Sequence, residues 1–459
     1  MKQIEAWLKK FRPTHLSSSR LSRSQTIALS FLGVIAAGTC LLMLPWATRA
    51  GETTNLLEAA FTAVSATCVT GLIVVDTFQH WTLFGQLVIL IMIQIGGLGF
   101  MTFSVWFALM MRRRIGLKER ELLQESVNTQ QIGGIIRLVR KILLGTLIFE
   151  GTGAILLSVR FVPEFGWGKG IYYGFFHSVS AFCNAGFDLM GTREAFSSLT
   201  GYVSDPLVNL TIMALIVIGG IGFLVWDDIS NYKWKFRKYR LHSKLALTMS
   251  FLLIFGGAFL FFLMERGGVL AGKDASDMIW GSLFQSVTTR TAGFNTLDIA
   301  GLRECTKLLM IALMFIGGSP GSTAGGVKTT TVAALLLYLR SLMRKDKGVE
   351  VFGRRLEEDT IKRAGSILSF SLFLDVTAAI ILAACTDIAL SDVLFEVCSA
   401  LGTVGITAGL TPGLPILCKL VLMLLMYCGR MGSLTFALVF TENRKNSLLQ
   451  KPVERIPIG

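Results

Sequence analysis

Four short motifs that end in glycine hold the residue types from which a cation pathway can be built. In the fourth of them, Thr403-Val404-Gly405, two residues with accessible backbone carbonyls precede the glycine. A ring of backbone carbonyls that points into a pore can replace the hydration shell of a cation. Aiming successive carbonyls the same way requires a backbone of alternating handedness, and glycine enters positive φ at little cost. The other three filter motifs, as we call them, are Cys68-Val69-Thr70-Gly71, Cys183-Asn184-Ala185-Gly186 and Arg290-Thr291-Ala292-Gly293.

The four filter motifs form an internal repeat. Their glycines are separated by 115, 107 and 112 residues, and a phenylalanine opens the same frame before each one. A single copy is explained better by a glycine-softened turn between helices, but four copies at a near-constant period indicate a shared architecture. The third copy is one residue shorter, because five residues separate Thr288 from Gly293 where the other copies have six. We therefore expect an asymmetric ring with fewer well-formed ion sites than a fourfold channel.

A glycine-rich stretch over residues 316–329 predicts an irregular loop at membrane depth. It contains five glycines and one proline, the two poorest helix formers. A nucleotide-binding P-loop is the alternative, but Val327 interrupts the spacing before Lys328 and no βαβ unit surrounds the stretch, so this interpretation is rejected. We interpret the glycine-rich loop as a polar constriction below the filter that gates it. Its candidate gate residues are Gly317, Gly318, Ser319, Pro320, Gly321, Ser322, Thr323, Ala324, Gly325, Gly326 and Lys328.

Arg430 is the remaining candidate gate residue, because it falls within an apolar stretch at nearly the depth of the glycine-rich loop. A charge at that depth costs a few kcal/mol, about 2.5 or more, unless it is paired or hydrated. We predict that the guanidinium projects inward and donates hydrogen bonds to carbonyls of the loop. The alternative is a purely structural ion pair with an acid such as Asp375. Glu150 and Asp375 also lie at membrane depth, and the sequence assigns them no role.

Other chemistry is poorly represented. The eight cysteines form no CxxC pair and the four histidines are scattered, so neither a disulfide framework nor a metal site is predicted. No grouping of His, Asp, Glu or Ser suits catalysis, and we predict that the protein is not an enzyme and holds no cofactor. A membrane enzyme or a scaffold of packed glycine-rich helices is the alternative from another functional class.

The composition places these motifs in a membrane. Of the 459 residues 52% are hydrophobic and only 16% are charged, whereas a soluble domain carries roughly 25% charged residues. The net charge of +14 raises nucleic acid as a partner, but 32 of the 44 lysines and arginines lie in five alternate inter-helix segments. This is the positive-inside pattern, which places both termini and the basic segments in the cytoplasm. Nucleic-acid binding is therefore rejected, and the lipid bilayer is the expected environment.

Each filter motif follows an apolar segment too short to span and sits between two longer ones. The pattern predicts an all-α integral membrane protein of four parallel repeats, each an outer helix, a pore half-helix that re-enters the membrane and an inner helix. Eight transmembrane helices and four re-entrant segments would surround a pseudo-fourfold pore. Glycines at 96–99, 219–222 and 429–432 of the inner helices predict close packing. The boundaries are a cytoplasmic amphipathic N-terminus 1–26, repeats at 27–111, 142–226, 245–339 and 364–440, and a cytoplasmic tail 441–459.

The four filter motifs, the loop 316–329 and this topology together resemble the superfamily of potassium transporters that includes the Trk, Ktr and plant HKT proteins. The triplet Thr403-Val404-Gly405 is also the one found in potassium-channel filters. Only some 26 polar residues precede the first span, so the chain is more similar to the membrane subunit of the bacterial Ktr system than to Trk, which carries an additional helix pair there.

The resemblance implies properties that composition and spacing do not show. The transported ion would be potassium, with sodium dependence, and the chain would form a homodimer in a bacterial cytoplasmic membrane. A cytosolic regulatory ring of RCK type would bind nucleotides and control the loop, with no nucleotide site on this chain. Only the fourth filter motif has the full Thr-Val-Gly, so a sodium-conducting relative and a K+/Na+ symporter remain the alternatives within transport.

Overall fold

The computed structural model of the chain describes residues 22–99, 102, 134–192, 194–346, 348–432 and 436. Most of the expected amphipathic N-terminus 1–26, most of the segment between the first two repeats and the expected tail 441–459 lie outside these residues. What is described consists of α-helices, four short 3-10 turns and one small β-ribbon.

Four long helices form the outer elements of the fold. They are α2 (Arg23–Leu42), α8 (Ile135–Phe165), α12 (Leu241–Glu265) and α16 (Glu358–Cys385). In the described part of the chain these are the four helices long and apolar enough to cross a membrane individually. A span needs about 20 apolar residues. The first begins at a capping box, in which Ser22 and Gln25 each bond the other's backbone N–H.

Four short helices, the pore helices, each lead into a filter motif. They are α3 (Leu56–Cys68), α9 (Trp167–Phe182), α13 (Ala275–Thr288) and α17 (Leu390–Leu401). With 12 to 16 residues, at about 1.5 Å per residue, none of them reaches across the hydrocarbon core. The phenylalanine that opens each repeated frame is fully buried in all four (Phe61, Phe176, Phe284 and Phe395).

The inner elements are shorter than predicted. They are α5 (Leu83–Leu98), α10 (Pro206–Gly220), α14 (Glu304–Phe315) and α18 (Ile416–Met431), each of 12 to 16 residues. Eight long membrane-crossing helices are therefore not present in the described part of the chain. The inner helix predicted to end the second repeat at residue 226 does not run unbroken to that point, because α10 and the following α11 (Phe223–Tyr232) meet at a bend of 96°. After α14 the chain is irregular, as the glycine content predicts, until α15 (Thr329–Arg344).

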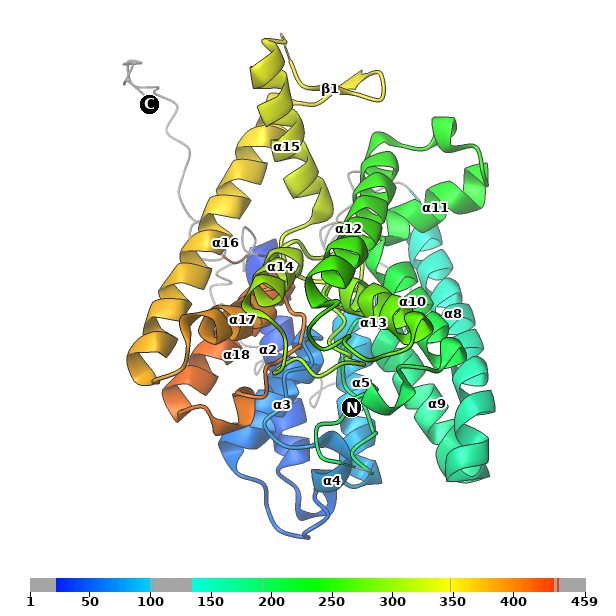
Figure 1. Ribbon diagram of the computed structural model, residues 1–459, viewed down its shortest axis with the longest axis vertical. Coiled ribbons are helices and arrows are strands. Elements are labelled where there is room, and N and C mark those ends of the chain that lie inside the picture. The colour runs from blue at the N-terminus through cyan, green and yellow to red at the C-terminus, as the bar shows by residue number, and fades with distance from the viewer. Residues whose placement is uncertain are drawn as a thin grey trace, which may run out of the picture.

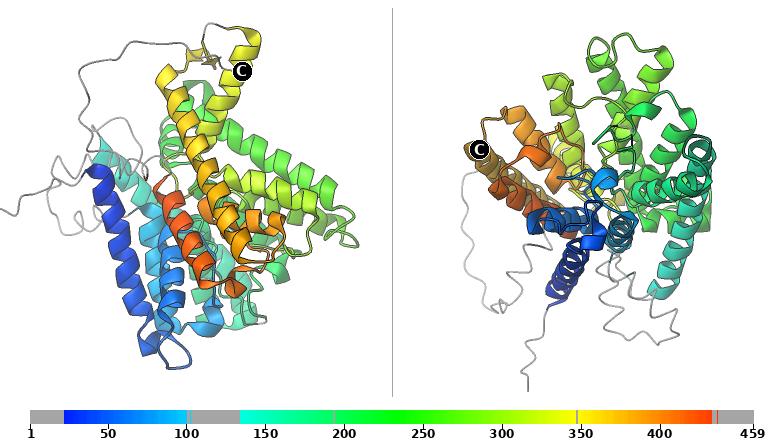
Figure 2. Two further views of the ribbon diagram at one scale, coloured as in Figure 1. Left: turned by 90° about the vertical axis from the view of Figure 1, so that its left-hand side faces the viewer. Right: turned by 90° about the horizontal axis from the view of Figure 1, so that it is seen from below.

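The four sets of helices are arranged around a common centre, which the view from below in Figure 2 shows. The inner helix of each set packs on the pore helix of the next: α5 on α9, α10 on α13 and α14 on α17. The last inner helix, α18, packs on the first pore helix, α3, so the arrangement closes on itself. In Figure 1, α15 and α16 lie side by side and extend away from this centre.

Glycines in three inner helices allow the close packing that the sequence predicts. A Cβ on Gly96 would lie 2.0 Å from the carbonyl oxygen of Thr67, and one on Gly219 would lie 2.1 Å from that of Phe182. A Cβ on Gly429 would lie 1.9 Å from the carbonyl oxygen of Leu401. Each inner helix therefore contacts the last turn of a pore helix directly, as small residues permit.

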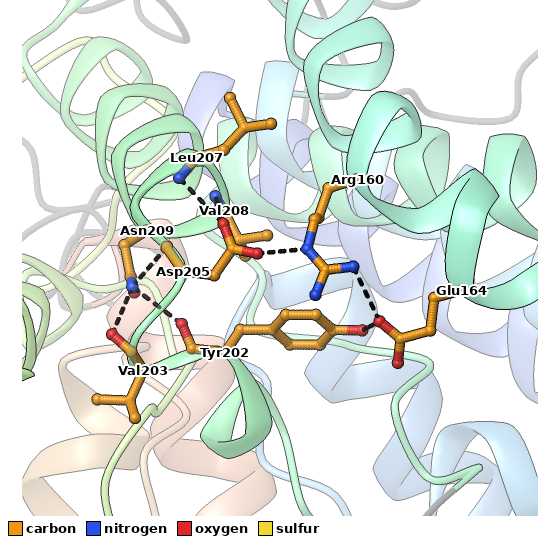
Figure 3. A network of polar contacts seen from close by, with 8 residues as sticks. All are labelled: Arg160, Glu164, Tyr202, Val203, Asp205, Leu207, Val208 and Asn209. Carbon is orange, nitrogen blue, oxygen red and sulfur yellow. Dashed lines mark hydrogen bonds and ion pairs between the residues drawn. The ribbon is translucent and has the colours of Figure 1, made fainter.

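A polar network fixes the start of α10 against α8 (Figure 3). The carboxylate of Asp205 accepts from the backbone N–H of Leu207 and Val208 and thereby caps α10, with Pro206 as its first residue. Arg160 on α8 donates through Nε to the same carboxylate at 2.5 Å. The Arg160 guanidinium also donates to Glu164, whose carboxylate accepts from the Tyr202 hydroxyl as well.

The remaining elements are small. They are the helix α4 (Thr77–His80), the 3-10 turns η1 (Pro45–Ala47), η2 (Thr200–Tyr202), η3 (Phe236–Lys238) and η4 (Thr411–Gly413), and the strands β1 (Glu350–Val351) and β2 (Arg354–Arg355). The two strands pair antiparallel, with Glu350 opposite Arg355, in the segment between α15 and α16. Apart from this ribbon of two-residue strands, the described part of the chain is helical, as predicted.

Candidate functional site

The glycines of the four filter motifs contact one another around a closed ring. A Cβ added to Gly71 would lie 2.5 Å from the Ala185 carbonyl oxygen, and one on Gly186 would lie 2.8 Å from that of Ala292. A Cβ on Gly293 would lie 2.7 Å from the Val404 carbonyl oxygen. Gly405 closes the ring, because its Cβ would lie 2.0 Å from the Thr70 carbonyl oxygen. No side chain other than hydrogen fits at these four positions without displacing backbone.

The backbone of every filter motif alternates in handedness, and glycine supplies only half of the alternation. The glycines have φ of +94°, +70°, +86° and +88° in chain order. Two residues before each glycine a second residue has positive φ: Val69 at 57°, Asn184 at 59°, Thr291 at 71° and Thr403 at 51°. Three of these are β-branched, for which this conformation is a genuine outlier. Such strain, of order 1–3 kcal/mol per residue, persists at functional sites where the surrounding structure imposes it.

A hydroxyl in the last turn of each pore helix holds the filter motif that follows. In the first and fourth copies it accepts from the glycine N–H, with Ser65 at 3.0 Å from Gly71 and Ser399 at 3.1 Å from Gly405. In the second and third copies the hydroxyl instead donates to the carbonyl after the glycine. Ser180 bonds the Phe187 oxygen at 2.7 Å and Thr288 bonds the Phe294 oxygen at 2.6 Å. Two of the four filter motifs are therefore held through the N–H of their glycine, and the other two through the carbonyl that follows it.

The glycine-rich loop is ordered by backbone hydrogen bonds to the bend between α10 and α11. Ser319 N–H donates to the Gly220 carbonyl at 2.9 Å and Thr323 N–H donates to the Gly219 carbonyl at 3.2 Å. In return, Phe223 N–H donates to the Gly321 carbonyl at 2.7 Å. The last carbonyls of α10 thus find donors in the loop rather than in a continuing helix. This exchange is the physical reason why the predicted inner helix of the second repeat is broken.

The loop also lies directly against two filter motifs. The Thr323 hydroxyl is 3.1 Å from the Phe182 carbonyl and 3.3 Å from Oδ1 of Asn184. On the other side, a Cβ on Gly325 would lie 2.0 Å from the Thr403 hydroxyl oxygen. The loop therefore occupies the space between the second and fourth filter motifs.

Arg430 makes the contact that the sequence predicts. Its guanidinium donates to the carbonyl of Thr323 in the glycine-rich loop, and also to the carbonyls of Gly96 and Gly97 at the end of α5. Charge-assisted bonds of this kind are among the strongest in proteins. Among the described residues no ion pair joins Arg430 to Asp375, so the alternative explanation of Arg430 is not supported.

Lys328 stabilises the loop from within. Its ammonium donates to the carbonyls of Ala324 at 2.7 Å and Gly325 at 3.1 Å. Ser319 and Thr329 join the two ends of the loop through their hydroxyls, 3.0 Å apart. A second link is the backbone bond from Gly317 N–H to the Val327 carbonyl, at 2.9 Å.

The other charged residues at this depth contact helices rather than the ring. The Arg290 guanidinium points to α12, where it donates to the Ser250 hydroxyl at 3.1 Å. Glu150 on α8 accepts from the Gln94 amide at 3.2 Å and from the Cys183 thiol. Asp375 on α16 likewise accepts from the thiol of Cys398. Arg290 and Cys183 therefore contribute backbone, not side chain, to the neighbourhood of the ring.

All the predicted filter residues are buried and lie in the four segments that the ring brings together. All the predicted gate residues lie in one loop below it or, for Arg430, in contact with that loop. Sequence reasoning missed the participation of Gly219 and Gly220, whose carbonyls accept from the loop. It also missed the positive φ of Val69, Thr291 and Thr403, for which valine and threonine give no signal. Within the described residues no group of His, Cys, Asp and Glu could hold a metal ion.

Comparisons with known proteins show the family of the chain and its fold. A family model described as "TrkH: Cation transport protein" matches residues 8–449. The potassium/sodium uptake protein NtpJ of Enterococcus hirae is 41% identical over 447 residues, covering 96% of this chain and 98% of its own. The Ktr system potassium uptake protein B of Bacillus subtilis is 41% identical over 431 residues, covering 94% and 95%. The crystal structure of the potassium transporter TrkH from Vibrio parahaemolyticus aligns with a TM-score of 0.73 at 19% identity, covering 94% of this chain and 88% of that one.

Proposed function

The chain belongs to the TrkH family of cation transport proteins, and from that premise we propose that it is the ion-translocating subunit of a potassium uptake system. It is a multi-pass membrane transporter and not an enzyme. Relatives that match nearly its full length are described as uptake proteins for potassium, and in one case for potassium and sodium. Two of the short inner elements, α10 and α14, are each followed after a break by a further helix, α11 and α15.

The observation that carries this proposal is the closed ring of four glycines and the carbonyls before them. Carbonyls held in a ring replace the water that a cation loses on entry. Each pore helix ends within two residues of the start of its filter motif, so the partial negative charge of its C-terminus, about half an elementary charge, is directed toward the ring. The Thr403 hydroxyl, buried and without a hydrogen-bond partner among the described residues, adds an oxygen at the loop side of the ring.

Passage would require the glycine-rich loop to move. Thr323 connects the loop to the second filter motif, and Arg430 holds the Thr323 carbonyl from the opposite side. Closing the path through hydrogen bonds leaves it openable, because such bonds exchange readily for others. A cytosolic ring of RCK type that binds nucleotides would control this exchange, and the chain would act as a homodimer with its basic segments in the cytoplasm of a bacterium.

The differences between the four filter motifs bear on which cation is transported. Two filter motifs are held through the glycine N–H and two through a carbonyl, and the third is one residue shorter. An asymmetric ring provides fewer equivalent ion sites, and the dependence of uptake on sodium that the resemblance to Ktr proteins implies is part of the proposal. A sodium-conducting protein or a K+/Na+ symporter is the alternative, favoured by the relative described as a potassium/sodium uptake protein.

Growth and uptake in a bacterial strain that lacks its own potassium transporters test the proposal. The chain would be expressed together with a Ktr-type regulatory subunit, and potassium uptake would be measured with and without external sodium. Rescue of growth at low potassium, with faster uptake when sodium is present, is the expected result. Sodium uptake without potassium uptake would favour the alternative. If neither ion is taken up while the protein is present in the membrane, the proposal is wrong.

A further inference from the structure

One position of the pore helices is polar in all four repeats although it is completely buried. It directly follows the phenylalanine that opens each frame. It lies nine residues before the filter glycine in three repeats and eight in the shorter third one. Its exposed fraction is no more than 1% in each case. The four residues are Thr62, His177, Gln285 and Glu396. A buried polar group in a membrane protein is costly unless it is hydrogen-bonded, so each one needs an explanation.

In the fourth repeat this residue, Glu396, bonds only to the chain that leaves the filter. One carboxylate oxygen accepts from the Thr407 hydroxyl and from the Ala408 N–H, the latter at 3.2 Å. The other oxygen accepts from the Thr411 hydroxyl at 2.9 Å. All three donors lie in residues 406–411, which we call the exit segment of the fourth filter motif. The carboxylate thus ties the pore helix before the filter to the chain after it.

The second repeat has a similar link in different chemistry. Nε2 of His177 accepts from the Leu189 N–H at 3.3 Å, while its Nδ1 faces the Tyr173 carbonyl at 2.7 Å. Leu189 lies three residues after Gly186, just as Ala408 lies three residues after Gly405. A neutral ring protonated on Nδ1 makes both bonds. The same backbone N–H is therefore held in two repeats by two unrelated side chains.

The first and third repeats have no such link. Among the described residues, neither the amide oxygen nor the amide nitrogen of Gln285 has a hydrogen-bond partner, and the Thr62 hydroxyl has none. Because the glycine contacts run in chain order around the ring, the second and fourth repeats face each other across it. The linked quarters are thus opposite, and the link in the fourth is the stronger, with three donors to a carboxylate.

We infer that Glu396 is a positioning residue that fixes the outer end of the fourth filter motif and thereby the preference for potassium over sodium. This inference rests on the proposed function. A buried acid needs hydrogen-bond donors, but this need alone does not explain why all three donors lie in the six-residue exit segment that follows the filter motif. Nor does an ion pair, since no basic side chain in the described part of the chain bonds Glu396. Thr403 and Val404 lie in the chain between the two ends that Glu396 connects, and the Val404 carbonyl lies beside Gly293 in the ring.

The test compares three substitutions in full-length protein reconstituted into liposomes, with potassium and sodium fluxes measured separately. Glu396→Ala removes all three bonds. Glu396→Gln removes the charge but keeps all three contacts, because its amide oxygen still accepts from Thr407 and Ala408 and its amide nitrogen can donate to the Thr411 hydroxyl. Gln285→Met is the matched control, because the same position of the third repeat makes no bond. We expect Glu396→Ala to raise the Michaelis constant for potassium and to lower the potassium-to-sodium flux ratio, each at least fivefold. Glu396→Gln and Gln285→Met should stay within twofold of the wild type.

Several outcomes would overturn the inference. An unchanged flux ratio in Glu396→Ala would show that the exit segment needs no such link. Equal impairment in Glu396→Gln would show that the charge matters rather than the hydrogen bonds, and equal impairment in Gln285→Met would show a general packing effect. If Glu396→Ala does not fold, Thr411→Val removes one of the three bonds, and an unchanged ratio there counts against the inference. If the wild-type protein carries neither ion, the proposed function is wrong as well. If the wild type prefers potassium and Glu396→Ala has the same potassium-to-sodium flux ratio, only the positioning role is wrong.

Discussion

Gly405 and Gly409 provide a matched pair with which to test the ring. Both have φ of +88°, so alanine introduces a similar backbone strain of about 1–2 kcal/mol at either position. Their surroundings differ. No atom lies within 4 Å of a Cβ on Gly409, whereas a Cβ on Gly405 would lie 2.0 Å from the Thr70 carbonyl oxygen and 2.8 Å from Cα of Gly71. Only at Gly405 does the substitution touch the candidate ion ligands.

The expected magnitude follows from that contact. Real Cβ atoms do not approach other atoms within 3.0 Å, so the Thr70 carbonyl or the fourth filter motif must move by 1 Å or more. Misplacement by that amount at a precisely arranged site can cost on the order of 100-fold, and each 1.4 kcal/mol, roughly, is tenfold in affinity. We therefore expect Gly405→Ala to raise the Michaelis constant for potassium about 10- to 100-fold and Gly409→Ala to leave it within about twofold.

The assay is initial-rate potassium uptake over a range of concentrations in the transporter-deficient strain, normalised to the amount of each variant in the membrane. Purified protein would be checked for monodispersity, so that loss of folding is separated from loss of affinity. Equal increases in both variants would show that backbone strain, not contact with the ring, controls affinity. Normal affinity in Gly405→Ala would refute the assignment of the ring as the ion site.

Three further predictions concern the loop, the packing and the response to pH. Arg430→Ala removes charge-assisted bonds worth about 1.5–3 kcal/mol each, so we expect potassium flux to rise about tenfold or more, and an unchanged flux would contradict a gating role. Gly429→Ala should lower the melting temperature in detergent because its Cβ would lie 1.9 Å from the Leu401 carbonyl, whereas Gly33→Ala, with nothing within 4 Å, should not. Burial lowers the pKa of His80, the last residue of α4. The stability that neutral His80 permits is therefore fully present above the unfolded-state pKa of about 6.5 and is lost as the pH falls through the lower pKa of the folded state. His80→Gln should weaken the drop in melting temperature that acid causes.

Much of the site could be predicted because it repeats. Any one filter motif is a few small residues, but the period made Gly71, Gly186 and Gly293 recognisable as partners of Gly405. The glycine-rich loop was predictable for a different reason, since helix propensity alone excludes a continuous helix there. The inward contact of Arg430 followed from the cost of leaving a charge unpaired at membrane depth.

What could not be predicted depends on contacts between repeats. The sequence of α10 is apolar and helical in character up to Trp226, and only the loop from another repeat explains why the helix ends at Gly220. Positive φ at Val69 and Thr403 contradicts their local preference, so it is imposed by the ring around them. The link made by Glu396 was visible in the sequence only as a polar residue at an equivalent position of each repeat, without any sign of its partners.

The closure of the ring by α18 on α3 has a consequence for how the protein is made. The same helix α18 also contacts α2 of the first repeat, where the Tyr427 hydroxyl donates to the Ala28 carbonyl at 2.8 Å across 399 residues of sequence. At a synthesis rate of about 5–20 residues per second, the first repeat waits roughly 20 to 80 s in the membrane for the fourth. During that time the carbonyls of Gly96 and Gly97 lack Arg430, and the last turn of α3 lacks its neighbour. A nascent chain that stalls before α18 would leave these groups exposed, and membrane quality control could recognise it by them.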